Sequence, residues 1–312
     1  PNENISQYPK EVSRLKKLNT PIIRAADTPK IIGIYFSLIF IFKNLLFKLY
    51  TYMDHNKAIK FLYTLSSKLN TYYKLNSNKK LIVDNKSKKK KIFNPVTNFD
   101  KNFEKMIRAN IIKSFPYDGI IGEEFKEKKG KSDNRWIIDP IDGTKAFVAG
   151  LPTWSNLVGL MYKKKTILGM ANFPQLKKTY YSYNNISYII EKKRKKKLRI
   201  KNVSNFKNSK IFCNFHEQNK DLKFFKKLNG FNKNLSRITL DALSYCLLAE
   251  GKIDAVIESD LKIYDVAAII PIVENAGGLI TTWNNKSAEK GGNILATSNK
   301  KLHYKLLRIL RS

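Results

Sequence analysis

Two aspartates, Asp139 and Asp142, lie three residues apart in the segment WIIDPIDGT, which spans residues 136–144. Hard divalent cations prefer oxygen ligands, and these two carboxylates and the backbone carbonyl between them are ligands of that kind. The apolar residues before Asp139 indicate the end of a buried strand. Pro140 cannot continue a strand ladder and Gly143 allows unusual backbone angles. The segment therefore predicts a turn that brings these oxygens together at the end of the strand.

The motif alone does not distinguish a cation site from an acidic surface turn, because short motifs match by chance. The chain has 59 lysines and arginines but only 25 aspartates and glutamates, so a local group of carboxylates indicates a specific role. Further carboxylates stand in three other segments: Asp100 in VTNFD, Glu123 in GEE and Asp265 in YDVAA. For Asp265 alone, capping of the helix predicted to follow it is the alternative.

These segments, in this order, resemble the inositol monophosphatase family of metal-dependent phosphomonoesterases, from about Met53 to the C-terminus. The segments AFVAGLPTW, ESDLKIYD and PIVENAGG look most like the histidinol-phosphate phosphatases of that family. The family typically has proline where this chain has Ile263 and a second glycine where it has Asn275, and neither position is a metal ligand. The resemblance implies an α/β (α+β) fold, a layered α/β/α/β/α sandwich of the inositol monophosphatase and fructose-1,6-bisphosphatase type.

The resemblance also implies a site for two or three Mg²⁺ ions, with one carboxylate bridging two of them. Glu123, Asp139 and the carbonyl of Ile141 would hold the first ion. Asp139, Asp142 and Asp265 would hold the second, and Glu123 with Asp100 would reach a third, weaker site. Glu124 is expected to face solvent or to lie beside the ligands.

Catalysis by metal-activated water is implied for Glu123, Thr144 and Asp100, with Thr144 and Asp100 positioning the attacking water. The amides of Gly143 and Thr144 would contact the phosphate. A second interpretation of Thr144 is the N-cap of a helix that starts at Lys145.

Glu258 and Asp241 are the predicted substrate-binding carboxylates, with Asp260 a weaker candidate, because histidinol phosphate carries an ammonium group. Capping of a helix at Ala242 is the alternative for Asp241. The predicted function is Mg²⁺-dependent hydrolysis of L-histidinol phosphate to L-histidinol and phosphate, in histidine biosynthesis. An inositol monophosphate or broad sugar-phosphate phosphatase is the alternative enzyme, and a basic RNA-associated protein with a vestigial site is the alternative outside the enzymes.

The net charge of +34 invites a nucleic-acid interpretation, but the lysines are spread along the whole chain. No zinc finger, helix-turn-helix or RNP-like motif accompanies them, so we expect a small-molecule phosphate ester as partner and no specific nucleic acid. Cys213 and Cys246 make no disulfide framework, which predicts buried free thiols in a reducing compartment, the cytoplasm. A homodimer is implied by the resemblance. The histidines, His55, His216 and His303, show no triad or metal spacing and are predicted to be structural.

Residues 1–52 are predicted to be an N-terminal extension outside the fold, either an upstream read-through before Met53 or a weak membrane segment over residues 31–50. The clean apolar run of residues 31–42 falls short of the roughly 20 residues that span a bilayer, so we do not expect a membrane protein. Residues 53–188 would form an α+β metal-binding subdomain and residues 189–312 an α/β subdomain.

Hydrophobic periodicity and breaker residues predict the elements that carry these side chains. Helices are expected at residues 55–75, 100–115, 145–148, 220–228, 242–250, 266–275 and 302–310. Strands are expected at residues 81–83, 120–121, 136–138, 157–161, 167–172, 179–183, 188–190, 255–257 and 294–297. Residues 85–92 are expected to form a lysine-rich loop near the site, and residues 192–197 a solvated hairpin tip.

Overall fold

The computed structural model describes residues 56–86, 94–200, 208–214 and 236–311. Residues 59–312 form one compact unit. The apolar segment 31–50, the helix expected at 220–228, His55, His216 and nearly all of the lysine-rich loop lie outside the described residues. The division into subdomains at residue 188 stays a prediction.

The larger of the two main sheets has seven strands, in the order β3-β4-β5-β6-β7-β8-β9. Its strands are β3 (Gly119–Gly122), β4 (Asn134–Asp142), β5 (Ser155–Tyr162), β6 (Lys165–Phe173), β7 (Lys178–Tyr183), β8 (Ile186–Glu191) and β9 (Arg194–Lys197). β3 is parallel to β4 and every other pair is antiparallel. The expected hairpin tip at 192–197 is therefore wrong in part: only Lys192 and Lys193 turn, both with positive φ, and the rest is an edge strand.

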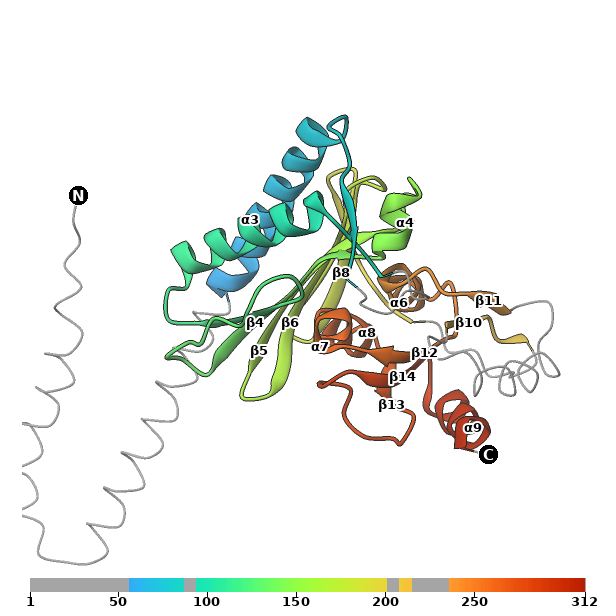
Figure 1. Ribbon diagram of the computed structural model, residues 1–312. Helices are drawn as coiled ribbons and strands as arrows, with labels where there is room; N and C mark the ends of the chain where they lie inside the picture. The colour runs from blue at the N-terminus through green and yellow to red at the C-terminus, as the bar shows by residue number, and fades with distance from the viewer. Residues whose placement is uncertain (1–55, 87–93, 201–207, 215–235, 312) are drawn as a thin grey trace, which may run out of the picture. The chain divides into compact units, whose positions relative to one another are not determined.

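Two helices cover one face of this sheet (Figure 1). The first spans residues 56–76 and buries Leu62, Leu65 and Leu69 at the expected helical spacing. The second, α3 (Asn98–Ser114), begins two residues earlier than expected because Thr97 is its N-cap.

Helices α6 (Ala242–Ala249) and α8 (Ile269–Glu274) lie between the seven-stranded sheet and a second sheet (Figure 1). Seven of the eight residues of α6 are buried, as a helix covered on both sides requires. The second sheet has the order β11-β10-β12-β14-β13 and carries the last helix on its outer face. These elements are β10 (Ile211–Asn214), β11 (Ser236–Ile238), β12 (Ala255–Leu261), β13 (Leu279–Thr282), β14 (Gly292–Thr297) and α9 (Lys300–Arg311).

The layers thus run helix, sheet, helix, sheet, helix, which confirms the predicted sandwich. Three strands of the second sheet, β10, β11 and β13, were not predicted, because short strands in a buried sheet lack the alternation that marks longer ones. The single helix expected from Val266 is wrong: α7 (Ile263–Val266) comes first and α8 follows it.

Two small elements complete the region around the acidic residues. The hairpin strands β1 (Val83–Asn85) and β2 (Pro95–Thr97) pair with each other, and β1 starts two residues later than expected. The short helix α4 (Thr144–Val148) follows β4 directly. None of the helices in the described residues combines the length and the apolar character that crossing a bilayer requires.

Candidate metal centre

A β-bulge, not a turn, brings Asp139 and Asp142 to the same side of the sheet. In a regular strand, residues three apart face opposite sides. Here β4 continues through Pro140, and its register against β5 shifts so that Asp139 pairs with Leu157 while Asp142 pairs with Ser155. Three steps along β4 therefore match two along β5, as in a bulge. The predicted turn at Pro140 is wrong, and the chain turns at Gly143 instead, where φ is +81°.

Asp265 joins these two aspartates from α7, a short helix that packs against β4 and β5. One carboxylate oxygen from each of Asp139, Asp142 and Asp265 lies within 4.8 Å of the others. Asp265 was expected before a helix, but it lies inside α7, where its Oδ2 accepts a hydrogen bond of 2.5 Å from the Lys262 amide. Asp265 is therefore not the N-cap residue, but as the third residue of α7 its carboxylate takes part in capping the helix start and also belongs to the cluster.

The three carboxylates destabilise one another in the absence of a cation. Burial raises the pKa of Asp139 well above its ordinary value, and the charges of Glu123 and Asp142 raise it further. Burial also raises the pKa of Asp142, and the charge of Asp241 raises it further. Burial raises the pKa of Asp265 to about 7. Buried like charges with oxygen donors this close fit a hard divalent cation, which would offset the repulsion.

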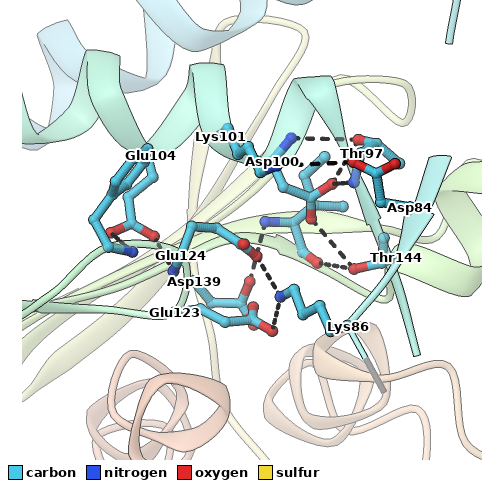
Figure 2. Close-up of polar contacts among 12 residues, drawn as sticks. Asp84, Lys86, Thr97, Asp100, Lys101, Glu104, Glu123, Glu124, Asp139 and Thr144 are labelled. Atoms are coloured by element: carbon cyan, nitrogen blue, oxygen red, sulfur yellow. Dashed lines mark hydrogen bonds and ion pairs between the residues drawn. The ribbon is translucent and has the colours of Figure 1, made fainter. Parts of the chain in front are cut away.

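Glu123 stands next to this cluster and pairs with a lysine (Figure 2). It follows β3, and its Oε1 lies 2.8 Å from Nζ of Lys86, which also pairs with Glu124. Burial alone would lower the pKa of Lys86, but the two carboxylates raise it above its ordinary value. Glu124 is thus largely buried beside the cluster, not solvent-facing. Lys86 belongs to the lysine-rich segment expected near the site, but nothing in the sequence distinguished it from the other lysines there.

Asp100 and Thr144 meet at the rim of the cluster (Figure 2). Asp100 is wholly buried, and its Oδ2 accepts hydrogen bonds from the amide, at 2.7 Å, and the hydroxyl of Thr97. Oγ1 of Thr144 lies 3.4 Å from Oδ1 of Asp100 and 3.0 Å from the carbonyl oxygen of Ile141. Gly143 is the N-cap of α4 and Thr144 its first residue, so the N-cap interpretation of Thr144 is wrong.

Asp241 and Glu258 lie on the side of the cluster near Asp142, whose pKa both of their charges raise. Glu258 is buried and accepts a hydrogen bond of 2.7 Å from Oγ1 of Thr239; burial raises its pKa to about 7. Burial raises the pKa of Asp241 as well, while Lys145 lowers it. Asp260 is exposed and pairs with Lys262 instead.

The alternative role of Asp241 as a helix cap is wrong. Its side chain makes no capping hydrogen bond among the described residues, although it precedes α6. Its backbone has φ +49°, an uncommon value for a residue with a side chain. The amide of Ala242 instead donates to Oδ2 of Asp142, at 2.9 Å. Strain of this kind is concentrated at functional sites, which supports the prediction that Asp241 contacts substrate.

Three further residues are buried, as expected of structural side chains. Cys213 and Cys246 are buried free thiols. His303 is buried between two threonines, with Nε2 2.9 Å from Oγ1 of Thr281 and Nδ1 2.9 Å from Oγ1 of Thr297.

Comparison with known proteins relates this arrangement to one family. The chain matches the model of the inositol monophosphatase family over residues 54–312. A solved structure of an IMPase from Thermotoga maritima superposes with a TM-score of 0.69 and 26% identity, over 81% of this chain and 96% of that one. The matches bear out the resemblance that the sequence motifs indicated.

Curated relatives carry several names. A histidinol-phosphatase of Mycobacterium tuberculosis is 29% identical over 222 residues, which cover 70% of this chain and 85% of that protein. The chloroplastic bifunctional phosphatase IMPL2 of Arabidopsis thaliana is 33% identical over 214 residues, covering 65% of this chain and only 60% of the relative's own length. A Haemophilus influenzae protein named Nus factor SuhB is 32% identical over 230 residues, 72% of this chain and 85% of that protein.

Proposed function

Because this chain belongs to the inositol monophosphatase family, we propose that it is a Mg²⁺-dependent phosphatase that hydrolyses L-histidinol phosphate to L-histidinol and phosphate. The observation that carries the proposal is the carboxylate cluster of Asp139, Asp142 and Asp265, with the partly buried Asp241 and the buried Glu258 beside it. The cluster supports metal-dependent chemistry, and the two further carboxylates support a cationic substrate.

A phosphate monoester resists hydrolysis because its dianion repels an attacking oxygen nucleophile. Bound Mg²⁺ neutralises that charge and makes hydroxide available near neutral pH. Glu123, Asp139 and the Ile141 carbonyl would hold one ion, and Asp139, Asp142 and Asp265 a second. Glu123 and Asp100 would reach a third.

Thr144 and Asp100 would position the attacking water. A threonine hydroxyl has one hydrogen, which can go to Oδ1 of Asp100 or to the carbonyl of Ile141. A cation held by that carbonyl would leave the hydrogen to Asp100. The lone pairs of Oγ1 would then accept a hydrogen from water and hold it for attack.

The substrate would lie with its phosphate at the amides of Gly143 and Thr144 and its leaving group toward Asp241 and Glu258. L-histidinol phosphate carries an ammonium and an imidazole on that leaving group. The buried carboxylate of Glu258 and the partly buried one of Asp241, whose φ is +49°, suit such a cation because its charge lowers the cost of their burial. The histidinol-phosphatase of Mycobacterium tuberculosis supports the same substrate.

An inositol monophosphate or sugar-phosphate phosphatase is the second candidate, favoured by the structural match to the Thermotoga maritima IMPase. Glu258 could accept hydrogen bonds from polyol hydroxyls as readily as it could face an ammonium group. A basic RNA-associated protein is the third, favoured by the relative named Nus factor SuhB. The cytoplasmic location and the homodimer stay predictions.

The deciding experiment compares kcat/KM for L-histidinol phosphate and inositol 1-phosphate at saturating Mg²⁺. We expect a preference for histidinol phosphate of at least tenfold, which replacement of Asp241 with Asn reduces while turnover of inositol 1-phosphate changes less. Equal efficiencies in the unsubstituted chain would favour the broader phosphatase. Absence of any phosphatase activity, together with RNA binding that does not need Mg²⁺, would overturn the enzyme proposal.

A further inference from the structure

The loop that carries Glu123 is held from behind by a buried carboxylate of α3. Glu104 is wholly buried, and its Oε2 accepts a hydrogen bond of 2.7 Å from the amide of Glu124 (Figure 2). Its Oε1 accepts a second, of 3.3 Å, from the amide of Phe125. Glu104 therefore binds the main chain directly after Glu123.

Glu104 also packs against the main chain directly before Glu123. A Cβ atom added at Gly122 would lie 2.1 Å from Oε1 of Glu104, so a residue with a side chain cannot occupy this position without displacing the carboxylate. Glu123 is thus flanked on both sides by residues in contact with Glu104, although no hydrogen bond joins the two carboxylates among the described contacts.

Arg108, one turn along α3, completes the arrangement. Its Nε donates to Oε1 of Glu104 at 2.7 Å, and its Nη2 donates to the carbonyl oxygen of Phe125 at 2.9 Å. The guanidinium also lies over the Phe125 ring, 5.9 Å from its centre. The ion pair thus binds both the amide and the carbonyl of one loop residue.

Stability alone does not explain a buried ion pair here. Well-packed apolar residues of similar volume are often equally stabilising or better, because removing two charges from water is costly. What an apolar pair could not do is accept two amides and donate to a carbonyl of the same loop. The distinctive contribution of Glu104 and Arg108 is therefore the fixed path of residues 122–125.

We propose that Glu104, supported by Arg108, is a positioning residue that fixes the backbone of Glu123 so that its carboxylate reaches the cluster of Asp139, Asp142 and Asp265. The proposal rests on the metal-binding role proposed above for Glu123. Glu104 itself touches neither metal nor substrate. Residues that orient ligands in this indirect way typically contribute about 10–100-fold to metal affinity or activity.

The test measures Mn²⁺ binding by the full chain, using the EPR signal of the free ion, without substrate. Glu104→Gln keeps the size of the side chain and one oxygen but removes the charge that holds Arg108. We expect Mn²⁺ affinity to fall about 10–100-fold. In assays with inositol 1-phosphate or histidinol phosphate, whichever is turned over, more Mg²⁺ should be needed for half-maximal rate. At saturating Mg²⁺ the KM should stay within about twofold of the unsubstituted value.

Asp118→Asn is the matched control. Asp118 is also a buried carboxylate beside β3, and it accepts hydrogen bonds from Nε1 of Trp136 at 2.9 Å and from Oγ of Ser132 at 2.7 Å, away from Glu123. We expect this variant to lower the melting temperature but to leave Mn²⁺ affinity unchanged. Equal weakening of Mn²⁺ binding in both variants would overturn the proposal, as would unchanged affinity in Glu104→Gln.

A second variant keeps the test decisive if Glu104→Gln does not fold. Arg108→Gln removes the guanidinium but leaves the carboxylate of Glu104 on its two amides, so a smaller loss of Mn²⁺ affinity is expected, no more than about tenfold, the lower end of the range for Glu104→Gln. Unchanged affinity in a folded Arg108→Gln protein would then overturn the proposal. Absence of Mn²⁺ binding in the unsubstituted chain would instead contradict the metal role of Glu123, whereas a different preferred ester would leave the inference intact.

Discussion

The side-chain amide of Asn156 donates a hydrogen bond of 2.7 Å to the carbonyl oxygen of Pro140. The bulge takes Pro140 out of the regular β4–β5 ladder, and this side chain, from the neighbouring strand β5, takes the place of the missing backbone donor. Asn156 is wholly buried and is held in turn by Nδ2 of Asn172, at 3.0 Å from its Oδ1. The backbone between the two cluster aspartates is thus fixed by a chain of amides.

Replacement of Asn156 with leucine should therefore lower both stability and activity. The variant leaves the Pro140 carbonyl and one hydrogen of Asn172 without their partner, at a cost of about 1–3 kcal/mol for each buried group left unpaired. Chemical denaturation and the Mg²⁺ concentration for half-maximal rate would be measured. Asn70→Ala is the control: it removes the outer partner of Asn172 but leaves Asn156 bound, so activity should be retained. Similar activity in both variants would contradict the role given to Asn156.

Replacement of Asp139 with asparagine should abolish turnover yet stabilise the metal-free protein. The substitution removes a buried charge that repels Glu123, Asp142 and Asp265. The melting temperature without metal should rise, and the increase that Mg²⁺ causes in the unsubstituted chain should be lost. In terms of the free energy of unfolding, the stabilisation by Mg²⁺ amounts to about 2.7 kcal/mol at a hundredfold excess of the ion over its dissociation constant. Retained phosphatase activity in this variant would contradict the site assignment.

Replacement of Gly143 with alanine should be more harmful than the same change at Gly150. Both glycines have positive φ, +81° and +75°, so both variants carry a backbone penalty of about 1 kcal/mol. At Gly143 the new Cβ would also lie 2.6 Å from Oδ2 of Asp241, whereas at Gly150 nothing lies within 4 Å. Activity and unfolding free energy should fall further for Gly143→Ala. Equal losses of activity and stability in the two variants would show that the close contact between the new Cβ and the Asp241 carboxylate has no effect.

Because His303 is buried, the folded protein should lose stability in acid. Burial lowers the pKa of His303 to about 4, from an ordinary value near 6.5. Below pH 6.5 the unfolded chain binds a proton at this residue and the folded chain does not, so stability falls as the pH falls from about 6.5 to 4 and stops falling below that. The slope approaches about 1.4 kcal/mol per pH unit.

Urea unfolding of the unsubstituted chain and of His303→Gln, at several pH values from 8 to 4, measures this contribution. The difference in unfolding free energy between the two proteins should narrow as the pH falls, because glutamine does not titrate. A difference that stays constant over that range would contradict the pKa assigned to His303.

The candidate ligands could be predicted from the sequence because their segments, in this order, resemble those of one metal-dependent family. The motif of Asp139 and Asp142 alone left an acidic surface turn as the alternative, and Asp265 alone left helix capping. What brings Asp139 and Asp142 to one side could not be predicted, since a bulge depends on register against β5 rather than on the residues of β4. A proline inside the strand indicated a turn, and only the sheet resolves it as a bulge.

Residues that act across the fold were also missed. Lys86 is one lysine among many until β1 places it between Glu123 and Glu124. Glu104 is separated in sequence from the loop that it binds, and a glutamate within a helix is ordinarily exposed, so nothing in its neighbours marks it as buried. Such contacts are properties of tertiary structure and leave no local pattern.

The outermost strand of the large sheet, β9, carries four consecutive basic side chains, and all four are exposed. An edge strand offers unpaired amides and carbonyls to any other strand, and lysines along it discourage such pairing. When two copies of this chain approach with these edges facing, the four positive charges of one copy lie opposite the four positive charges of the other. Repulsion between like edges thus protects the sheet from growing into an aggregate, which gives part of the large positive charge a physical use unrelated to any ligand.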